Sequence, residues 1–136
     1  DKTDIDLKNR IIDSPLEDGL ISLHANQMAT IIAGGGNSSP DSRGVVSAAK
    51  VTSASFASPF PDPLSYYQQN GIAVQNHSYG YAIENYYGAE AREYDLMINS
   101  SPHLLHVFSS GNRGMDISTS GSFTGVEGYA NLTGNM

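Results

Sequence analysis

The segment LHANQMATIIAGGG, residues 23–36, carries the clearest fold signal in the chain. From Met28 to Ala33 it is apolar almost all round, which is typical of a helix enclosed within a domain. Three glycines follow at 34–36, and glycine is the residue that most often ends a helix. The sequence therefore predicts a buried helix over residues 23–33.

On either side of this helix the composition changes sharply. Residues 1–22 mix charges with isolated apolar residues, which predicts an irregular, partly exposed entry with a short extended piece around residues 10–13. Residues 37–44 (NSSPDSRG) have the composition of a loop. Residues 45–56 are rich in small and β-branched side chains, which predicts a strand.

A second helix is predicted over residues 64–69. Pro63 suits the first helical position, Asp62 is a candidate N-cap, and the pair Asn70 and Gly71 ends the pattern.

Two short apolar runs, residues 72–76 and 104–108, predict buried strands, and residues 87–98 between them have helical periodicity. Helices and strands thus alternate along the chain. Strands without polar alternation, separated by helices, indicate a mixed α/β domain with a parallel sheet and helices on both faces. Chemistry in such sheets lies at the carboxyl ends of the strands, which directs attention to the loops after residues 74 and 108.

Composition excludes several classes of function. The net charge is −7, and the seven Lys and Arg residues are scattered, so a nucleic-acid partner is disfavoured. The chain has no cysteine, which rules out a disulfide framework and a thiolate nucleophile. The longest apolar runs are too short to span a bilayer. The four histidines show no metal-ligand spacing with the carboxylates, so no metal site is predicted.

His24 stands at the start of the predicted helix over residues 23–33. The helix dipole disfavours an imidazolium at this end, so a neutral imidazole that acts as a general base is a reasonable interpretation. From its position alone, an ordinary surface histidine near a helix cap is the commoner case.

The segment from His24 to Gly34 resembles the histidine motif of the subtilisin-like serine peptidases (subtilases), H-G-T-H-V-A-G-x-I-A-G. The resemblance implies that His24 is the catalytic histidine, and Ala29, Ile32 and Ala33 also match. The departures include Ala25, Gln27, Met28 and Thr30. Residues 44–51 (GVVSAAKV) then resemble the family's G-V-A-P-x-A-x-L strand entry, with serine in place of proline.

A second likeness lies in residues 74–80 (VQNHSYG), which are similar to the family's V-I-N-x-S-x-G. It implies that Ser78, Tyr79 and Gly80 bind substrate by pairing with it as an added strand, and glycine permits a close approach. An ordinary junction between strand and loop is the alternative. His77 points away from Ser78 in a strand and is interpreted as structural.

A third likeness lies in residues 106–114 (HVFSSGNRG), which are similar to V-x-A-A-G-N-x-G. It implies that the side-chain amide of Asn112 donates to the oxyanion, and that Ser110 and Gly111 belong to the wall of the specificity pocket. A donor of this kind, as measured in a subtilisin, contributes about a hundred- to a thousandfold in rate. The three likenesses occur in family order and together cover roughly residues 5 to 115.

The aspartate and serine of the Asp-His-Ser triad have no counterpart that we can match. No Gly-Thr-Ser segment opens an apolar helix, and Ser118, Ser120 and Ser122 lie in a loop-like run. We therefore interpret residues 1–136 as the central part of a subtilase catalytic domain. On this interpretation the chain is an inactive fragment of a serine endopeptidase, and its partners are a protein or peptide substrate and the remaining parts of its own domain.

Two alternatives stay open. The departures in the histidine motif fit a pseudoprotease or a peptide-binding module on the same fold, and an unrelated doubly wound α/β domain is a third interpretation. The resemblance implies a secreted or cell-surface protein. It implies no cofactor for catalysis; calcium is common in the family, but no calcium loop can be matched here.

Overall fold

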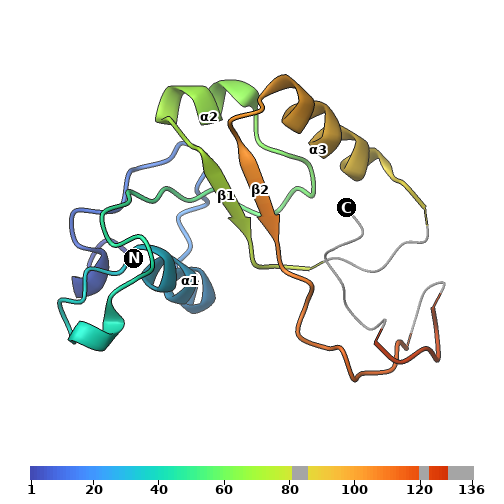
Figure 1. Cartoon of the computed structure of the whole chain (residues 1–136), viewed down its shortest axis with the longest axis horizontal. Helices are drawn as coiled ribbons and strands as arrows, with labels where there is room; N and C mark the ends of the chain where they lie inside the picture. The colour runs from blue at the N-terminus through green and yellow to red at the C-terminus, as the bar shows by residue number, and fades with distance from the viewer. Residues whose placement is uncertain (81–85, 120–122, 129–136) are drawn as a thin grey trace. The chain divides into compact units, whose positions relative to one another are not determined.

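The structure is a computed structural model that describes residues 1–80, 86–119 and 123–128. The chain divides into two compact units, Asp1–Ala57 and Ser58–Met136, and each is described here by itself. Across both units the described residues form three α-helices and a two-stranded parallel sheet (Figure 1). The predicted mixed α/β class with a parallel sheet is confirmed.

The helix of the first unit, α1 (Leu23–Ala33), has the predicted bounds. It begins where the Ser22 hydroxyl accepts a hydrogen bond from the Ala25 amide at 3.2 Å. The predicted burial is wrong, because Leu23 and Ile31 are 74% and 58% exposed and only Ala33 is fully enclosed. Within its unit α1 packs on the short 3-10 helix η1 (Ile5–Leu7), which covers part of one side. An apolar sequence indicates that a helix needs cover, and it does not show where that cover lies.

The backbone crosses closely over the end of α1. Three successive amides donate to carbonyls of its last turn and C-cap: Gly44 to Gly34 (2.9 Å), Val45 to Ile31 (3.0 Å) and Val46 to Ile32 (2.7 Å). A Cβ atom on Gly44 would lie 2.5 Å from the Gly34 nitrogen. Only glycine permits this crossing, which satisfies carbonyls that a helix end otherwise leaves without partners.

This crossing explains why the predicted strand over residues 45–56 is wrong. Its first amides are bonded to α1, and residues 45–48 form a turn. Extended pairing is confined to Val51, which forms a parallel bridge with Ile11 inside the predicted extended piece. The bridge has two hydrogen bonds, from the Ile12 amide to the Val51 carbonyl (2.8 Å) and from the Val51 amide to the Arg10 carbonyl (2.9 Å). The predicted loop before it contains a second 3-10 turn, η2 (Pro40–Ser42).

The second unit contains α2 (Leu64–Asn70), β1 (Val74–His77), α3 (Ala89–Ser100) and β2 (Leu105–Phe108). Gly71 ends α2 in the left-handed region at φ 61°, as the Asn-Gly signal predicts. Pro63 is itself the N-cap, so the prediction of Asp62 in that role is wrong. The Asp62 carboxylate instead accepts a hydrogen bond from the Gln75 side-chain amide at 2.8 Å.

Strands β1 and β2 lie side by side and run in the same direction (Figure 1), with Gln75 opposite His106 and His77 opposite Phe108. Alternation of side chains puts these four residues on one face of the sheet. Tyr67 of α2 contacts His106, and Tyr94 of α3 contacts His77, His106 and Phe108. Both helices therefore pack on the same face.

The opposite face of the sheet consists mainly of apolar side chains in contact with solvent. Val74, Leu105 and Val107 are 57%, 59% and 43% exposed. The strands are therefore buried on one side only, and the prediction of strands buried throughout is wrong for the described structure.

Candidate functional site

The second and third family-like segments leave the sheet at the same end. Ser78–Gly80 follow β1 directly, and Ser109–Asn112 follow β2 directly. The last strand pair, His77 and Phe108, is extended by a hydrogen bond from the Ser109 amide to the His77 carbonyl at 3.1 Å. The structure thus brings these two predicted site segments to one edge, as parallel strands require.

The segment Ser78–Gly80 is accessible where a peptide would have to approach it. Gly80 is exposed, whereas Ser78 and Tyr79 are half-buried. The Asn76 side-chain amide donates to the Ser78 hydroxyl at 2.8 Å. This bond ties the start of the segment to the strand before it and leaves the glycine open.

Asn112 follows a glycine in the left-handed conformation. Gly111 has φ 86°, a conformation that favours glycine, and it turns the chain immediately before Asn112. Both Ser110 and Asn112 are exposed. The turn after Asn112 is closed by a hydrogen bond from the Asp116 amide to the Arg113 carbonyl at 3.1 Å. The asparagine side chain is therefore presented to solvent between two turns.

His24 belongs to the first unit, where it is the second residue of α1 and is exposed. The departures from the family motif leave the helix intact around it. The Ala25 amide is bonded to the Ser22 cap, and the Thr30 hydroxyl donates to the Asn26 carbonyl of its own helix at 2.9 Å. The structure confirms the position of His24 at a helix start; its catalytic role stays a prediction.

Sequence reasoning missed a hydrogen-bonded array beneath the edge formed by β1 and β2. Nδ1 of His77 lies 2.7 Å from the Tyr79 hydroxyl, and Nε2 of His77 lies 3.0 Å from Nδ1 of His106. His77 is 2% exposed and stacks on Phe108. The burial agrees with the structural interpretation of His77. The spacing of His106 and Phe108 puts both side chains on one face of β2, but no signal in the sequence pairs that face with His77.

Burial decides the charge of this array. It lowers the pKa of His77 to about 4, with a smaller contribution from the neighbouring His106, and it lowers the pKa of His106 as well. Burial also raises the pKa values of Tyr67 and Tyr94. At neutral pH the group is therefore uncharged, and it acts through hydrogen bonds.

A second buried polar group, Asp6, joins two segments of the first unit. Its carboxylate accepts hydrogen bonds from the Asn37 amide (2.5 Å), the Ser38 amide (3.0 Å) and the Ser38 hydroxyl. The bonds from Ser38 are the main reason that the pKa of Asp6 is lowered. Asp6 is bonded to backbone and serine in the interior, which identifies it as a structural residue.

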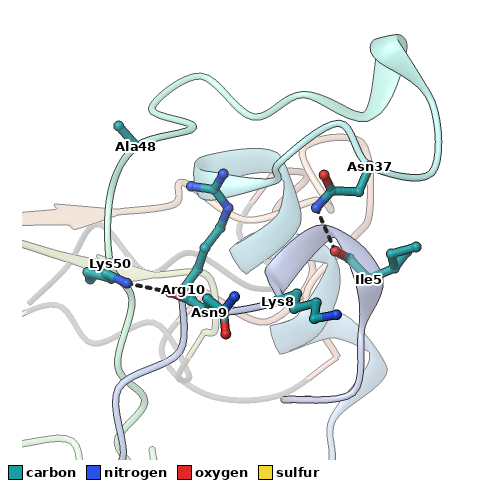
Figure 2. A pocket seen from close by; sticks show the side chains of 7 residues that line it. All are labelled: Ile5, Lys8, Asn9, Arg10, Asn37, Ala48 and Lys50. Atoms are coloured by element: carbon teal, nitrogen blue, oxygen red, sulfur yellow. Dashed lines mark hydrogen bonds between the residues drawn. The ribbon is translucent and has the colours of Figure 1, made fainter.

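The first unit also has an open hollow of about 700 Å³ whose basic residues are Lys8, Arg10 and Lys50 (Figure 2). The Lys50 ammonium group donates to the Asn9 carbonyl, as Figure 2 shows. None of the site residues predicted from the sequence lines this hollow.

The remaining predictions concern metals, membranes and serines. Within residues 1–80, 86–119 and 123–128, no three His, Asp or Glu side chains are grouped as a metal site would require. No helix in the same part of the chain has the length and apolar character to cross a bilayer. Ser118 is buried, whereas Ser120 and Ser122 lie outside the described residues.

One family model spans all three of the family-like segments. Residues 8–132 match the model of the Subtilase family, and the match continues past the last of the three segments. Neither a curated protein nor a solved structure gives a significant match to the chain. Membership of this family implies serine peptidase chemistry and peptide substrates. With nearly its whole length matched, the chain belongs to the Subtilase family.

Proposed function

We propose that these residues form the central part of the catalytic domain of a serine endopeptidase. His24 is the general base, Asn112 is the oxyanion donor, and Ser78–Gly80 bind the substrate backbone, with Ser110 and Gly111 beside the specificity pocket. The aspartate and the nucleophilic serine come from other parts of the same protein, so the 136 residues alone are inactive.

The observation that carries the proposal is the register of β1 and β2. It brings an open, glycine-ended segment and an exposed asparagine to the same end of adjacent strands. A peptide paired with Ser78–Gly80 would have its scissile carbonyl near the Ser110–Asn112 turn. The asparagine amide would then donate to the negative charge that develops on that oxygen in the transition state.

His24 supplies the proton transfer in this mechanism. A neutral imidazole takes the proton of the serine hydroxyl as it attacks the carbonyl, and then returns it to the leaving amine. An exposed histidine in the first turn of a helix suits the role, because its imidazole is open to a serine hydroxyl that approaches from outside the helix.

The proposal is tested on the full-length protein with a fluorophosphonate probe, which labels activated serines. We expect labelling of the wild type, no labelling of His24→Ala, and normal labelling of the matched control His103→Ala, an exposed histidine outside the site. Asn112→Ala should retain labelling and lose about a hundred- to a thousandfold in kcat for a peptide substrate. Labelling that survives in His24→Ala would refute the assignment of the base.

The second candidate is a pseudoprotease or peptide-binding module, which the departures Ala25, Gln27 and Thr30 favour. Against it, the helix start at His24 is capped and regular. A wild-type protein that binds peptides but never reacts with the probe, after removal of any propeptide, would establish this alternative.

We also propose that the protein works outside the cytoplasm, secreted or at the cell surface. The low charged fraction of 15% and the lack of cysteine are compatible with an exported peptidase. Detection of the protein in the culture medium or at the cell surface after fractionation would support this location; recovery from the cytoplasm alone would refute it.

A further inference from the structure

Beneath the peptide-binding edge, a line of hydrogen bonds runs through side chains that the proposed mechanism does not use. It links the Tyr79 hydroxyl to His77 (2.7 Å) and His77 to His106 (3.0 Å). Tyr94, on α3, packs edge-on against both imidazole rings. The line therefore connects the edge to both strands, and α3 packs against it.

The position of Tyr79 makes this connection mechanically important. Tyr79 is the middle residue of Ser78–Gly80 and lies two residues beyond the end of β1, so its side chain falls on the same face as His77. On the other side, the Asn76 amide holds the Ser78 hydroxyl at 2.8 Å. Hydrogen bonds on both faces of the extended chain thus hold the edge.

The directions of the bonds follow from the chemistry of neutral imidazole, which has one N–H donor and one acceptor nitrogen. If the Tyr79 hydroxyl donates to Nδ1 of His77, the His77 proton is on Nε2 and is donated to Nδ1 of His106. The proton of His106 is then on Nε2, which is buried and has no partner among the described residues. A buried polar atom without a partner lowers stability, so a contribution to stability does not explain why this array is present.

The explanation is the need for a rigid peptide-binding edge. A substrate strand pairs with a segment whose backbone is already extended and fixed more tightly than with one that must be ordered on binding. We infer that His77 and His106, through the hydroxyl of Tyr79, are positioning residues that hold Ser78–Gly80 ready to pair with an extended peptide. The inference rests on the proposed function, because it assigns a role within the same site.

The test compares three variants of the full-length protein. Tyr79→Phe removes only the hydroxyl. His77→Asn has an amide where Nδ1 lies and keeps a partner for Tyr79, whereas His77→Gln has its amide where Nε2 lies and loses that partner. The matched control is Tyr87→Phe, which removes an exposed tyrosine hydroxyl bonded to Asp95 at 2.6 Å in the same unit.

With a chromogenic peptide substrate, we expect Tyr79→Phe and His77→Gln to raise KM about tenfold, the effect of one lost hydrogen bond, with kcat within about twofold. His77→Asn should stay within about threefold of the wild-type KM, and Tyr87→Phe should equal the wild type. Equal effects of His77→Asn and His77→Gln, or an unchanged KM for Tyr79→Phe, would overturn the positioning role while the proposed peptidase function stood.

A second measurement covers the case in which the wild type hydrolyses nothing and the proposed function fails. Hydrogen exchange of the amides at residues 76–80 is then compared in the wild type, Tyr79→Phe and Tyr87→Phe. Faster exchange confined to this segment in Tyr79→Phe supports positioning of the edge. Exchange equal to that of the wild type overturns it, and this readout also decides the matter if both His77 variants fail to fold.

Discussion

The crossing of the backbone over the end of α1 makes a strong prediction for Gly44→Ala. A Cβ atom at this position would lie 2.5 Å from the Gly34 nitrogen and 2.7 Å from the Ala33 nitrogen. Ordinary contact begins at 3.4 Å, so the backbone would have to separate by about 0.9 Å. Neither neighbour is a side chain that could rotate away, and the strain must therefore be absorbed by the crossing itself.

The expected cost combines two effects. Overpacking against a fixed structure costs about 1–3 kcal/mol. Separation of the two segments also weakens the three hydrogen bonds from residues 44–46 to α1, each of which contributes about 1 kcal/mol. We expect the free energy of unfolding of the first unit to fall by about 3 kcal/mol in total, a large fraction of the stability of a small domain.

Hydrogen exchange of the amides at residues 31–34 and 44–46 measures this change, and it should be accelerated about a hundredfold. The control is Gly19→Ala in the same unit, where a Cβ atom meets nothing within 4 Å but φ is +74°. Its left-handed backbone costs about 1 kcal/mol, which corresponds to about a fivefold acceleration. If Gly44→Ala is no more disruptive than Gly19→Ala, the close crossing does not exist in solution.

Three further predictions follow from the buried polar groups. Asp6→Asn removes the carboxylate that is bonded to Ser38, so urea unfolding followed by circular dichroism should show lower stability at neutral pH. Because the pKa of Asp6 is lowered in the folded protein, the wild type loses the contribution of this carboxylate only as the pH falls below about 3.8, and the variant should lack this loss of stability in acid. Tyr67→Phe removes a hydroxyl that donates to Gln75 at 2.7 Å, and we expect a thermally less stable protein by about 1–2 kcal/mol, whereas an unchanged melting temperature would contradict the bond. Because the pKa of His77 is lowered to about 4, the unfolded chain binds a proton more readily than the folded chain between pH 6.5 and about 4, and the stability of the second unit should fall by about 3 kcal/mol as the pH decreases across that window and then level off. Tyrosine fluorescence can follow this unit, because all eight tyrosines lie in residues 58–136. A stability that does not change with pH would show that the imidazole is not buried.

The helices could be predicted from the sequence because local residues determine where they begin and end. The glycines at 34–36 end α1 and Gly71 ends α2, and both signals act within a few residues. The strand at residues 45–56 could not be predicted correctly, since its first amides find their partners on a helix 14 residues earlier in the chain. The sequence pattern also did not predict how much of α1 and of the two strands is buried, because burial depends on which surfaces of the fold pack together.

The candidate site shows the same division. The ends of the two apolar runs located Ser78–Gly80 and Asn112 on one sheet edge, because parallel strands bring their carboxyl ends together. The array of Tyr79, His77 and His106 depends on the register of β1 against β2. In that register each residue lies opposite one that is 31 positions later in the chain, as His77 lies opposite Phe108. No periodicity within either strand contains that register.

The uncovered face of the sheet has a consequence for how the chain behaves in concentrated solution. The exposed face of this two-stranded sheet carries an apolar strip of three side chains, Val74, Leu105 and Val107. An exposed apolar strip of this kind favours association with other copies of the chain. The isolated 136-residue polypeptide should therefore have a low solubility limit and form oligomers that light scattering detects. Val107→Lys would place a charge within the strip. This variant should raise the protein concentration at which light scattering first detects oligomers.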